Sequence, residues 1–181
     1  MTIERLDPAD PLALERFEQA FYTAFARAKG NRLVRRLWDW DDTRQRIRPR
    51  IPYTDQVIYV IWDENQDVDT ATAVNLRLAS YQAAILGFAP PPAELSGHSE
   101  ILALFSRRDA QLVSLRTFLC QVSSLLLDQG VISTDATSTD RLLPVYRHIG
   151  GEPIDQRSID GENRTLLRFQ LRQVAELKEL T

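Results

Sequence analysis

Three residues have the types and positions that best suit acid–base or binding chemistry. Glu100 opens an otherwise apolar stretch. Partial burial there would raise the pKa of its carboxyl group toward the range of a general base, although it could instead simply pair with a cation. Arg77 lies near the end of an earlier β-branched stretch, where its guanidinium could hold a substrate carboxylate or pair with Glu100. Tyr146 could protonate a leaving group, or it could be a core residue whose hydroxyl is hydrogen-bonded.

A run of arginines gives the N-terminal third of the chain a positive charge. Between Arg27 and Arg50 there are nine Lys or Arg residues and three Asp residues, which gives this segment a charge of +6. Because the net charge of the whole chain is −3, the remaining residues together carry −9. Arg44, Arg46 and Arg48 form the most regular part of this segment. The pattern predicts either a docking surface for an anionic partner or a solvated basic face. We do not expect a nucleic acid as partner, because the whole chain is acidic and contains no recognised binding motif.

The sequence also argues against several functional classes. Cys120 is the only cysteine, so no disulfide can form within the chain and a reducing compartment is expected. Two histidines and one cysteine are too few for a soft-metal site, and no nucleophile elbow, Walker loop or dinucleotide fingerprint is present. The first residues lack the order of a signal peptide, and no apolar run approaches the ~18 residues of a membrane span. We therefore expect a cytoplasmic protein with no membrane span and no metal.

Hydrophobic periodicity predicts the helices and strands that would position these residues. Apolar residues at three- and four-residue steps predict helices, and β-branched or alternating stretches predict strands. The expected helices span 11–29, 33–38, 109–129 and 142–149, and the expected strands span 57–62, 70–78, 99–105, 131–136, 152–155 and 164–171. Residues 41–55 and the long connection 81–98 are expected to be loops. The length of 181 residues suits one domain, residues 1–181.

The element order and one local motif resemble the GNAT acyltransferase fold. In TSTDRLLPVYRHIGGEPI, a helix carries Tyr146 and His148 and ends at Gly150 before a strand. This is similar to the helix of GNAT proteins that ends in a tyrosine, a few residues and a glycine pair. The resemblance implies an α+β fold with three layers, α/β/α, in which helices flank a GNAT-like mixed and mostly antiparallel central sheet.

A second set of residues is similar to autoinducer synthases (acyl-homoserine-lactone synthases) and long-chain N-acyl amino acid synthases. Arg77 and Leu78 end one strand, the connection 81–98 follows, and Glu100 opens the next strand before a Ser-Arg end at 106–107. The resemblance implies an N-acyltransferase that moves an acyl group from acyl-carrier protein or acyl-CoA to an amino acid or similar amine. The thioester would be a co-substrate, with no permanently bound cofactor.

The same resemblance implies roles for individual residues. Glu100 would be the base of the reaction and Tyr146 a possible acid. The substrate-binding residues would be Arg77, Phe105 and Ser106, and the contacts to the donor or its carrier protein would be Arg107, Arg108, Arg44, Arg46 and Arg48. An acidic carrier protein would dock on these arginines.

Two departures from the family pattern keep other functions open. The glycine-rich pyrophosphate loop of CoA-dependent GNAT enzymes should fall in SRRDAQLVSL, which contains no glycine. A turn without glycine hinders the close approach of the backbone to the pyrophosphate of acetyl-CoA, which weakens the acetyl-CoA interpretation. The carrier-protein interpretation is weakened less, because an acyl-carrier protein presents a single phosphodiester. Trp38, Trp40 and Asp41 match the autoinducer-synthase pattern only partly, so lactone synthesis itself is not expected. The alternatives are a non-catalytic GNAT-like binding or regulatory module and an acetyl-CoA-dependent acetyltransferase with an unusual loop.

Overall fold

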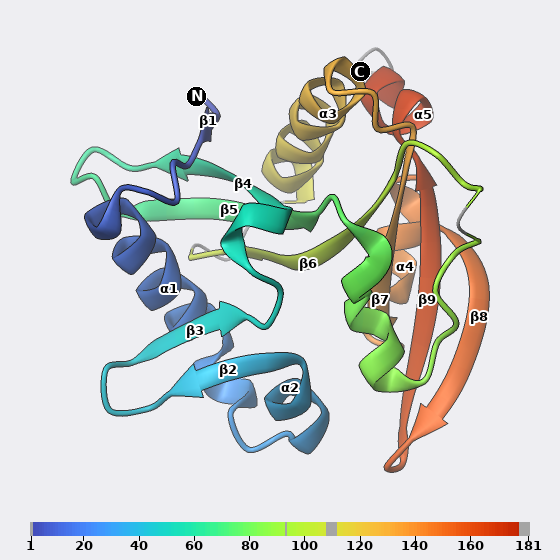
Figure 1. Cartoon of the computed structure of the whole chain (residues 1–181), viewed down its shortest axis with the longest axis horizontal. Coiled ribbons are helices and arrows are strands. Elements are labelled where there is room, and N and C mark those ends of the chain that lie inside the picture. Colours follow the sequence, from blue (N-terminus) through green and yellow to red (C-terminus); the bar gives the residue numbers. More distant parts are fainter. Residues whose placement is uncertain (1, 93, 108–111, 178–181) are drawn as a thin grey trace.

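A seven-stranded sheet forms the centre of the protein. The computed structural model describes residues 2–92, 94–107 and 112–177. The strands lie in the order β1 (Glu4–Arg5), β4 (Gln56–Trp62), β5 (Val68–Asn75), β6 (His98–Ser106), β7 (Ser133–Thr139), β9 (Glu162–Gln170) and β8 (Glu152–Ile159). Neighbours β6 and β7 are parallel, and the other five neighbouring pairs are antiparallel. The expected mixed, mostly antiparallel sheet is confirmed (Figure 1).

Helices cover both faces of this sheet because successive residues of its strands point to opposite sides. On β4, Ile58 shares a core with helices α1 (Pro11–Phe25) and α2 (Arg32–Leu37), whereas Tyr59 shares a core with helix α3 (Leu112–Asp128). Two short α-helices, α4 (Leu143–His148) and α5 (Leu171–Glu176), follow β7 and β9 in the chain (Figure 1). The expected three layers are confirmed. None of the helices in the described ranges is long and apolar enough to cross a membrane.

The helix α1 begins and packs as its sequence predicts. The side chain of Asp10 accepts hydrogen bonds from two backbone N–H groups of the first turn, which fixes the start of the helix. Phe17 and Phe21 are fully buried, and both rings contact the ring of Phe105 on β6. The aromatic stripe of α1 therefore holds the helix against the central strand of the sheet.

The expectation of a loop throughout residues 41–55 is wrong. Strands β2 (Trp38–Asp41) and β3 (Arg46–Pro49) form an antiparallel hairpin, and β3 packs against α1. In β3, Arg46 and Arg48 alternate with the buried residues Ile47 and Pro49. A period-two pattern of only four residues, ending in proline, is too short to distinguish a strand from a loop in the sequence.

The parallel strands β6 and β7 separate after a short contact. Residues 98–100 pair with residues 133–135, and the ladder ends there. A bulge in the β5–β6 ladder makes Leu102 an extra residue on β6. Its carbonyl accepts hydrogen bonds from the indole N–H of Trp38 at 3.1 Å and the side-chain amide of Gln82 at 3.2 Å. Two side chains thus bind the backbone just beyond the vertex of the separating strands.

The connection 81–98 carries a helical piece that lies against the same vertex. The short 3-10 helices η3 (Leu78–Ser80) and η4 (Gln82–Leu86) follow β5. In η4, Ala83 and Leu86 are buried in the core shared with α1 and α2. The connection is therefore packed against the sheet in this part, and it brings Gln82 close to β6.

Candidate active site

A cavity of about 570 Å³ opens where β6 and β7 separate. Helices α1 and α2 and strand β6 supply much of its wall, including the apolar residues Phe25, Val34, Leu37, Trp38, Leu102 and Leu104. Polar side chains come from β7, β9 and the segments beside them, namely Thr137, Thr139, Arg141, Glu162 and Arg164. The volume and the mostly apolar wall with a few polar groups are typical of small-molecule sites.

A second cavity of about 390 Å³ adjoins the first on the side of α3. Both are lined by Ala24, Phe25, Leu104, Arg141, Leu142 and Tyr146. The second cavity adds Phe105, Ser106 and Leu115. A long ligand could therefore pass from one cavity into the other along β6.

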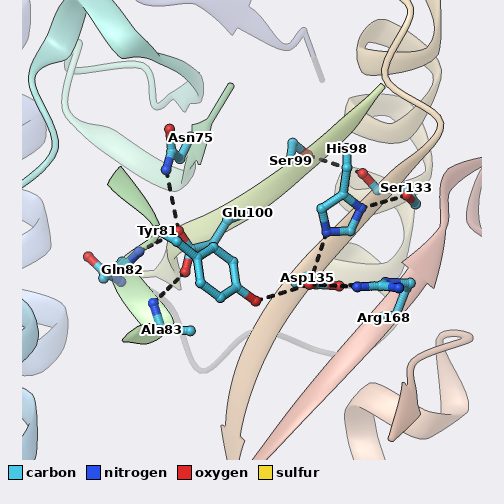
Figure 2. A network of polar contacts seen from close by, with 10 residues as sticks. All are labelled: Asn75, Tyr81, Gln82, Ala83, His98, Ser99, Glu100, Ser133, Asp135 and Arg168. Atoms are coloured by element: carbon cyan, nitrogen blue, oxygen red, sulfur yellow. Dashed lines mark hydrogen bonds and ion pairs between the residues drawn. The ribbon is translucent and has the colours of Figure 1, made fainter. Parts of the chain in front are cut away.

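Glu100 lies at the vertex, where β6 and β7 last pair. It is 2% exposed, and its carboxylate accepts hydrogen bonds from the backbone N–H groups of Gln82 at 2.8 Å and Ala83 at 2.7 Å and from the Asn75 amide at 3.4 Å (Figure 2). Burial raises the pKa of Glu100 to about 7, against the effect of these hydrogen bonds. Among the described residues its partners are N–H groups rather than a cation. Glu100 lines neither cavity, but its partner Gln82 lines the larger one.

Asp135 is the register partner of Glu100 and has the opposite electrostatic surroundings. Arg168 donates to both of its oxygens, at 2.9 and 3.0 Å, and the Tyr81 hydroxyl donates to it at 3.0 Å (Figure 2). His98 Nε2 lies 2.9 Å from the same carboxylate. Burial acts to raise the pKa of Asp135, but the contacts with His98 and Arg168 outweigh it and hold the pKa below its ordinary value. Two facing carboxyl groups therefore have pKa values shifted in opposite directions.

Ser133, His98 and Asp135 have the composition of a nucleophilic triad but not its accessibility. The Ser133 hydroxyl lies 2.6 Å from Nδ1 of His98. On the other side of the ring, the close approach of Nε2 to Asp135 falls outside hydrogen-bond geometry. Ser133 is 3% exposed, and neither it nor His98 lines the two cavities. Because a nucleophile must reach its substrate, we interpret these buried contacts as ones that join β6 to β7.

These groups belong to a polar row that crosses the sheet. Asn75, Glu100, Asp135 and Arg168 are successive register partners on β5, β6, β7 and β9, so their side chains share one face. Glu100 was predicted from the sequence, whereas Asp135, Arg168 and Tyr81 were not. A signal was present at Asp135, which is the single charge inside a strand of small residues, whereas Arg168 is one of three charged residues of β9. This signal becomes specific only when β7 and β9 are known to be neighbours.

Arg77 lies away from this row. Its side chain is 73% exposed, and its Nε lies 3.4 Å from Asp55. Asn75, two residues earlier, takes the position beside Glu100. The structure therefore does not bring Arg77 and Glu100 together as a pair.

The other expected substrate-binding and catalytic residues line the cavities. Phe105 and Ser106 line the smaller cavity, and Phe105 also packs on the phenylalanines of α1. Tyr146 lines both cavities, and its ring meets that of Phe169 edge-on, with centroids 6.1 Å apart. Burial raises the pKa of Tyr146, and its hydroxyl has no hydrogen-bond partner among the described residues. The phenol is thus available to a ligand in either cavity.

Acidic side chains pair with most of the arginines expected to receive the donor. Arg44, Arg46 and Arg107 each form an ion pair with a nearby aspartate or glutamate. Arg48 is exposed and forms no ion pair within the described part of the chain. Arg108 lies outside the described residues. The positive charge of the segment is therefore balanced locally at several of these positions.

No protein-family model and no curated protein sequence matches the chain, whereas solved structures match it over nearly its full length. The CoA-dependent acyl-homoserine lactone synthase MesI has a TM-score of 0.72 at 11% identity, covering 99% of this chain and 96% of that one. BjaI, another such synthase solved with SAM and isopentyl-CoA, has a TM-score of 0.70 at 15% identity, covering 97% and 86%. An aminoglycoside 6'-acetyltransferase type Ii has a TM-score of 0.62 at 10% identity, covering 94% and 97%. The expected resemblance is confirmed at the level of structure: this chain has the GNAT-type α+β fold that acyl-homoserine lactone synthases share with acetyltransferases.

Proposed function

We propose that the protein is an N-acyltransferase that moves an acyl group from a thioester to an amino acid or similar amine. The observation that carries this proposal is the open cavity of about 570 Å³ between β6 and β7, in a fold whose similar solved structures include acyl-homoserine lactone synthases and acetyltransferases. An enzyme of this kind needs an open cleft between the separated strands. A non-catalytic module does not, so the open cleft favours the enzyme over that alternative.

The separated strands offer the groups that acyl transfer requires. Beyond Glu100 the ladder between β6 and β7 has ended, and residues 101–104 line the cavity. Backbone N–H groups on an unpaired strand edge can bind a thioester carbonyl and stabilise the oxyanion of the tetrahedral intermediate. The apolar walls beside this edge can receive an acyl chain.

In this proposal Glu100 is the base and Tyr146 the acid. A carboxyl group with a pKa of about 7 is suited to accept a proton from an ammonium group near neutral pH. Because Glu100 does not line the cavity, the proton must reach it through a water molecule or after a shift of Gln82. The hydroxyl of Tyr146, which has no partner among the described residues, can protonate the leaving thiolate, since Tyr146 belongs to the wall of both cavities.

The finer proposal concerns the donor, which is an acyl-CoA or an acyl-carrier protein. We assign its pantetheine arm to the smaller cavity, beside Phe105 and Ser106. An acidic carrier protein could approach Arg48, which has no ion pair with any described residue, but would have to compete with the ion pairs of Arg44 and Arg107. Both kinds of donor must therefore be supplied in the test.

The test is a transfer assay read by mass spectrometry. The protein is incubated with acyl-CoAs or acyl-carrier proteins of several chain lengths, acetyl-CoA included, and with a pool of amino acids. SAM is added as a further acceptor because BjaI was solved with it. We expect an N-acyl amino acid as product. Product from acetyl-CoA alone would favour the acetyltransferase alternative, and no product with any donor would overturn the proposal.

A further inference from the structure

Two buried polar side chains in the larger cavity each have an atom without a partner. Gln82 donates its side-chain amide N–H to the Leu102 carbonyl at 3.2 Å, which fixes the orientation of the amide. Its Oε1 then has no hydrogen-bond partner among the described residues, and neither has Nε of Arg164. Both side chains line the cavity. A buried polar atom without a partner costs free energy, so a ligand group that reaches either atom from the cavity would be bound favourably.

Arg164 is held rigidly at its position. It is 6% exposed, and its Nη2 lies 2.7 Å from one oxygen of Glu162. The other oxygen of Glu162 accepts a hydrogen bond from the Asn31 amide at 2.8 Å. Glu162 therefore orients the guanidinium and is itself oriented by the start of α2. A planar guanidinium fixed in this way is suited to bind a carboxylate with two hydrogen bonds.

The charge at this end of the cavity favours an anion. Arg141 and Arg164 carry two positive charges and Glu162 one negative charge, which leaves a balance of +1 for these lining residues. Arg141 is exposed and forms no ion pair within the described ranges. Its guanidinium is therefore free to approach a ligand that Arg164 already holds.

The two ends of the cavity differ in polarity. Arg164 is the register partner of Thr139, four residues along β7 from Asp135, the partner of Glu100. Four residues of a strand span about 13 Å, and side chains two or four residues apart share one face. The vertex offers the acceptor oxygen of Gln82 beside Glu100, and the other end offers the donors of Arg164. A ligand whose carboxylate lies at Arg164 and whose remainder extends along β7 toward the vertex fits this arrangement.

We infer that the cavity holds a subsite for the carboxylate of an amino acid, with Arg164 as its principal ligand and Arg141 as a second one. The nitrogen of the amino acid then lies on the side of the carboxylate that faces the vertex. That this amino acid is the acyl acceptor rests on the proposed function, whereas its binding does not. The subsite places the anchoring role on Arg164 rather than on Arg77, which is exposed and lies next to Asp55.

The test measures binding without turnover. N-octanoylglycine and N-octanoylglycinamide differ only in the carboxylate, and their affinities are compared by isothermal titration calorimetry. We expect the wild-type protein to bind the acid about tenfold or more tightly than the amide, since hydrogen bonds to charged groups have this strength. Arg164→Met should remove the preference and leave the affinity for the amide unchanged. Arg141→Met should reduce the preference for the acid in part. Arg172→Met, at an exposed position of α5, should not change this preference.

Several results would overturn the subsite: equal affinities for acid and amide, binding of neither, or an unchanged preference in Arg164→Met. Should that variant fail to fold, Arg164→Lys keeps the charge without the planar fork and should show a weakened preference, and the exposed variant Arg141→Met tests the same site. A preference for the acid with no transfer from any donor would support the subsite and overturn the proposed function. Equal transfer rates to amines with and without a carboxylate would support the function and overturn the subsite.

Discussion

At the scale of single residues, the two buried carboxyl groups at the vertex show how surroundings separate the roles of similar side chains. Asp135 lies beside Arg168 and His98, which favour its charged form. Burial disfavours the charged form of Glu100, which accepts hydrogen bonds from N–H groups and also faces the charge of Asp135. Two carboxyl groups with pKa values moved apart are the usual arrangement of an acid–base site. A separate experiment tests each of these two carboxyl groups.

Glu100→Gln should change how stability depends on pH. The pKa of Glu100 is about 7 in the folded protein and 4.5 ordinarily, so the folded state retains a proton that the unfolded state releases between these values. This group therefore stabilises the fold below about pH 4.5, and that contribution is lost as pH rises to about 7. As the pH rises from 5 to 8, the unfolding free energy of the variant minus that of wild type should increase by about 2–3 kcal/mol. Urea denaturation at both pH values measures this, and an unchanged difference would contradict the raised pKa.

Removing the Asp135 carboxylate should destabilise the protein strongly. Asp135→Asn removes the negative charge beside Arg168 and His98 and replaces one of the two acceptor oxygens by an NH2 donor, which should cost about 2–4 kcal/mol near neutral pH. A double-mutant cycle with Arg168→Met should give a coupling of about 1–3 kcal/mol, because the two side chains make two hydrogen bonds to each other. Chemical denaturation of the four proteins is the measurement, and additive losses would show that the pair is not coupled.

Glu100→Gln and Tyr146→Phe should both slow acyl transfer without unfolding the protein. The loss of a general base or acid lowers turnover by about 10²–10⁴. Tyr22→Phe is the matched control, because Tyr22 lines neither cavity. Initial rates are measured together with melting temperatures, and full turnover in a folded variant would remove that residue from the mechanism.

At the scale of elements, a close backbone contact just before the first paired residues sets where β6 and β7 begin. The carbonyl of Gly97 accepts hydrogen bonds from the backbone N–H groups of Ile132 at 2.6 Å and Ser133 at 3.2 Å. Gly97 has a φ of +67°, and a Cβ atom there would lie 2.6 Å from the carbonyl oxygen of Gly130. The position thus requires glycine both for its conformation and for space.

Gly97→Ala should therefore destabilise the protein more than replacement of a glycine that has a positive φ but enough space for a Cβ atom. We expect a loss of about 2 kcal/mol or more from the left-handed backbone and the backbone clash together. Gly161→Ala is the control, because Gly161 has a φ of +80° but nothing within 4 Å of an added Cβ, so its loss should be about 1 kcal/mol. Thermal and urea unfolding of both variants test the difference, and equal losses would contradict the clash.

The elements themselves were mostly predictable because long amphipathic patterns determine them locally. The stripe of α1 and the β-branched run of β4 appear in the sequence and in the structure over nearly the same residues. The hairpin β2–β3 was missed because each of its strands has only four residues. The helix α5 was missed because it begins at Leu171, where the alternating pattern of β9 ends.

At the scale of the whole molecule, the separation of β6 from β7 creates the cavity on which the proposed function depends. Thr137 lies on β7 in the cavity wall and is partly exposed. Thr137→Trp should fill the cavity and abolish the binding of octanoyl-pantetheine, the part that acyl-CoA and acyl-carrier protein share. Ligand at about a hundred times its Kd should raise the melting temperature of wild type by about 5–10 °C. The shift should vanish in Thr137→Trp and persist in the control Ser158→Trp, which lies on exposed β8; a retained shift in Thr137→Trp would place the ligand elsewhere.

The sequence by itself indicated the chain positions of the main helices and strands and singled out Glu100 as a candidate, because periodicity and a lone carboxylate in an apolar strand are local features. Its resemblance to the GNAT family indicated the class of fold. The tertiary structure decided the partners. It placed Asn75 rather than Arg77 beside Glu100, paired Asp135 with Arg168, and brought Arg164 and Gln82 into one cavity. These outcomes depend on which strands are neighbours and in which register, and residues separated by 33 or 82 positions in the chain meet only when the sheet sets that register.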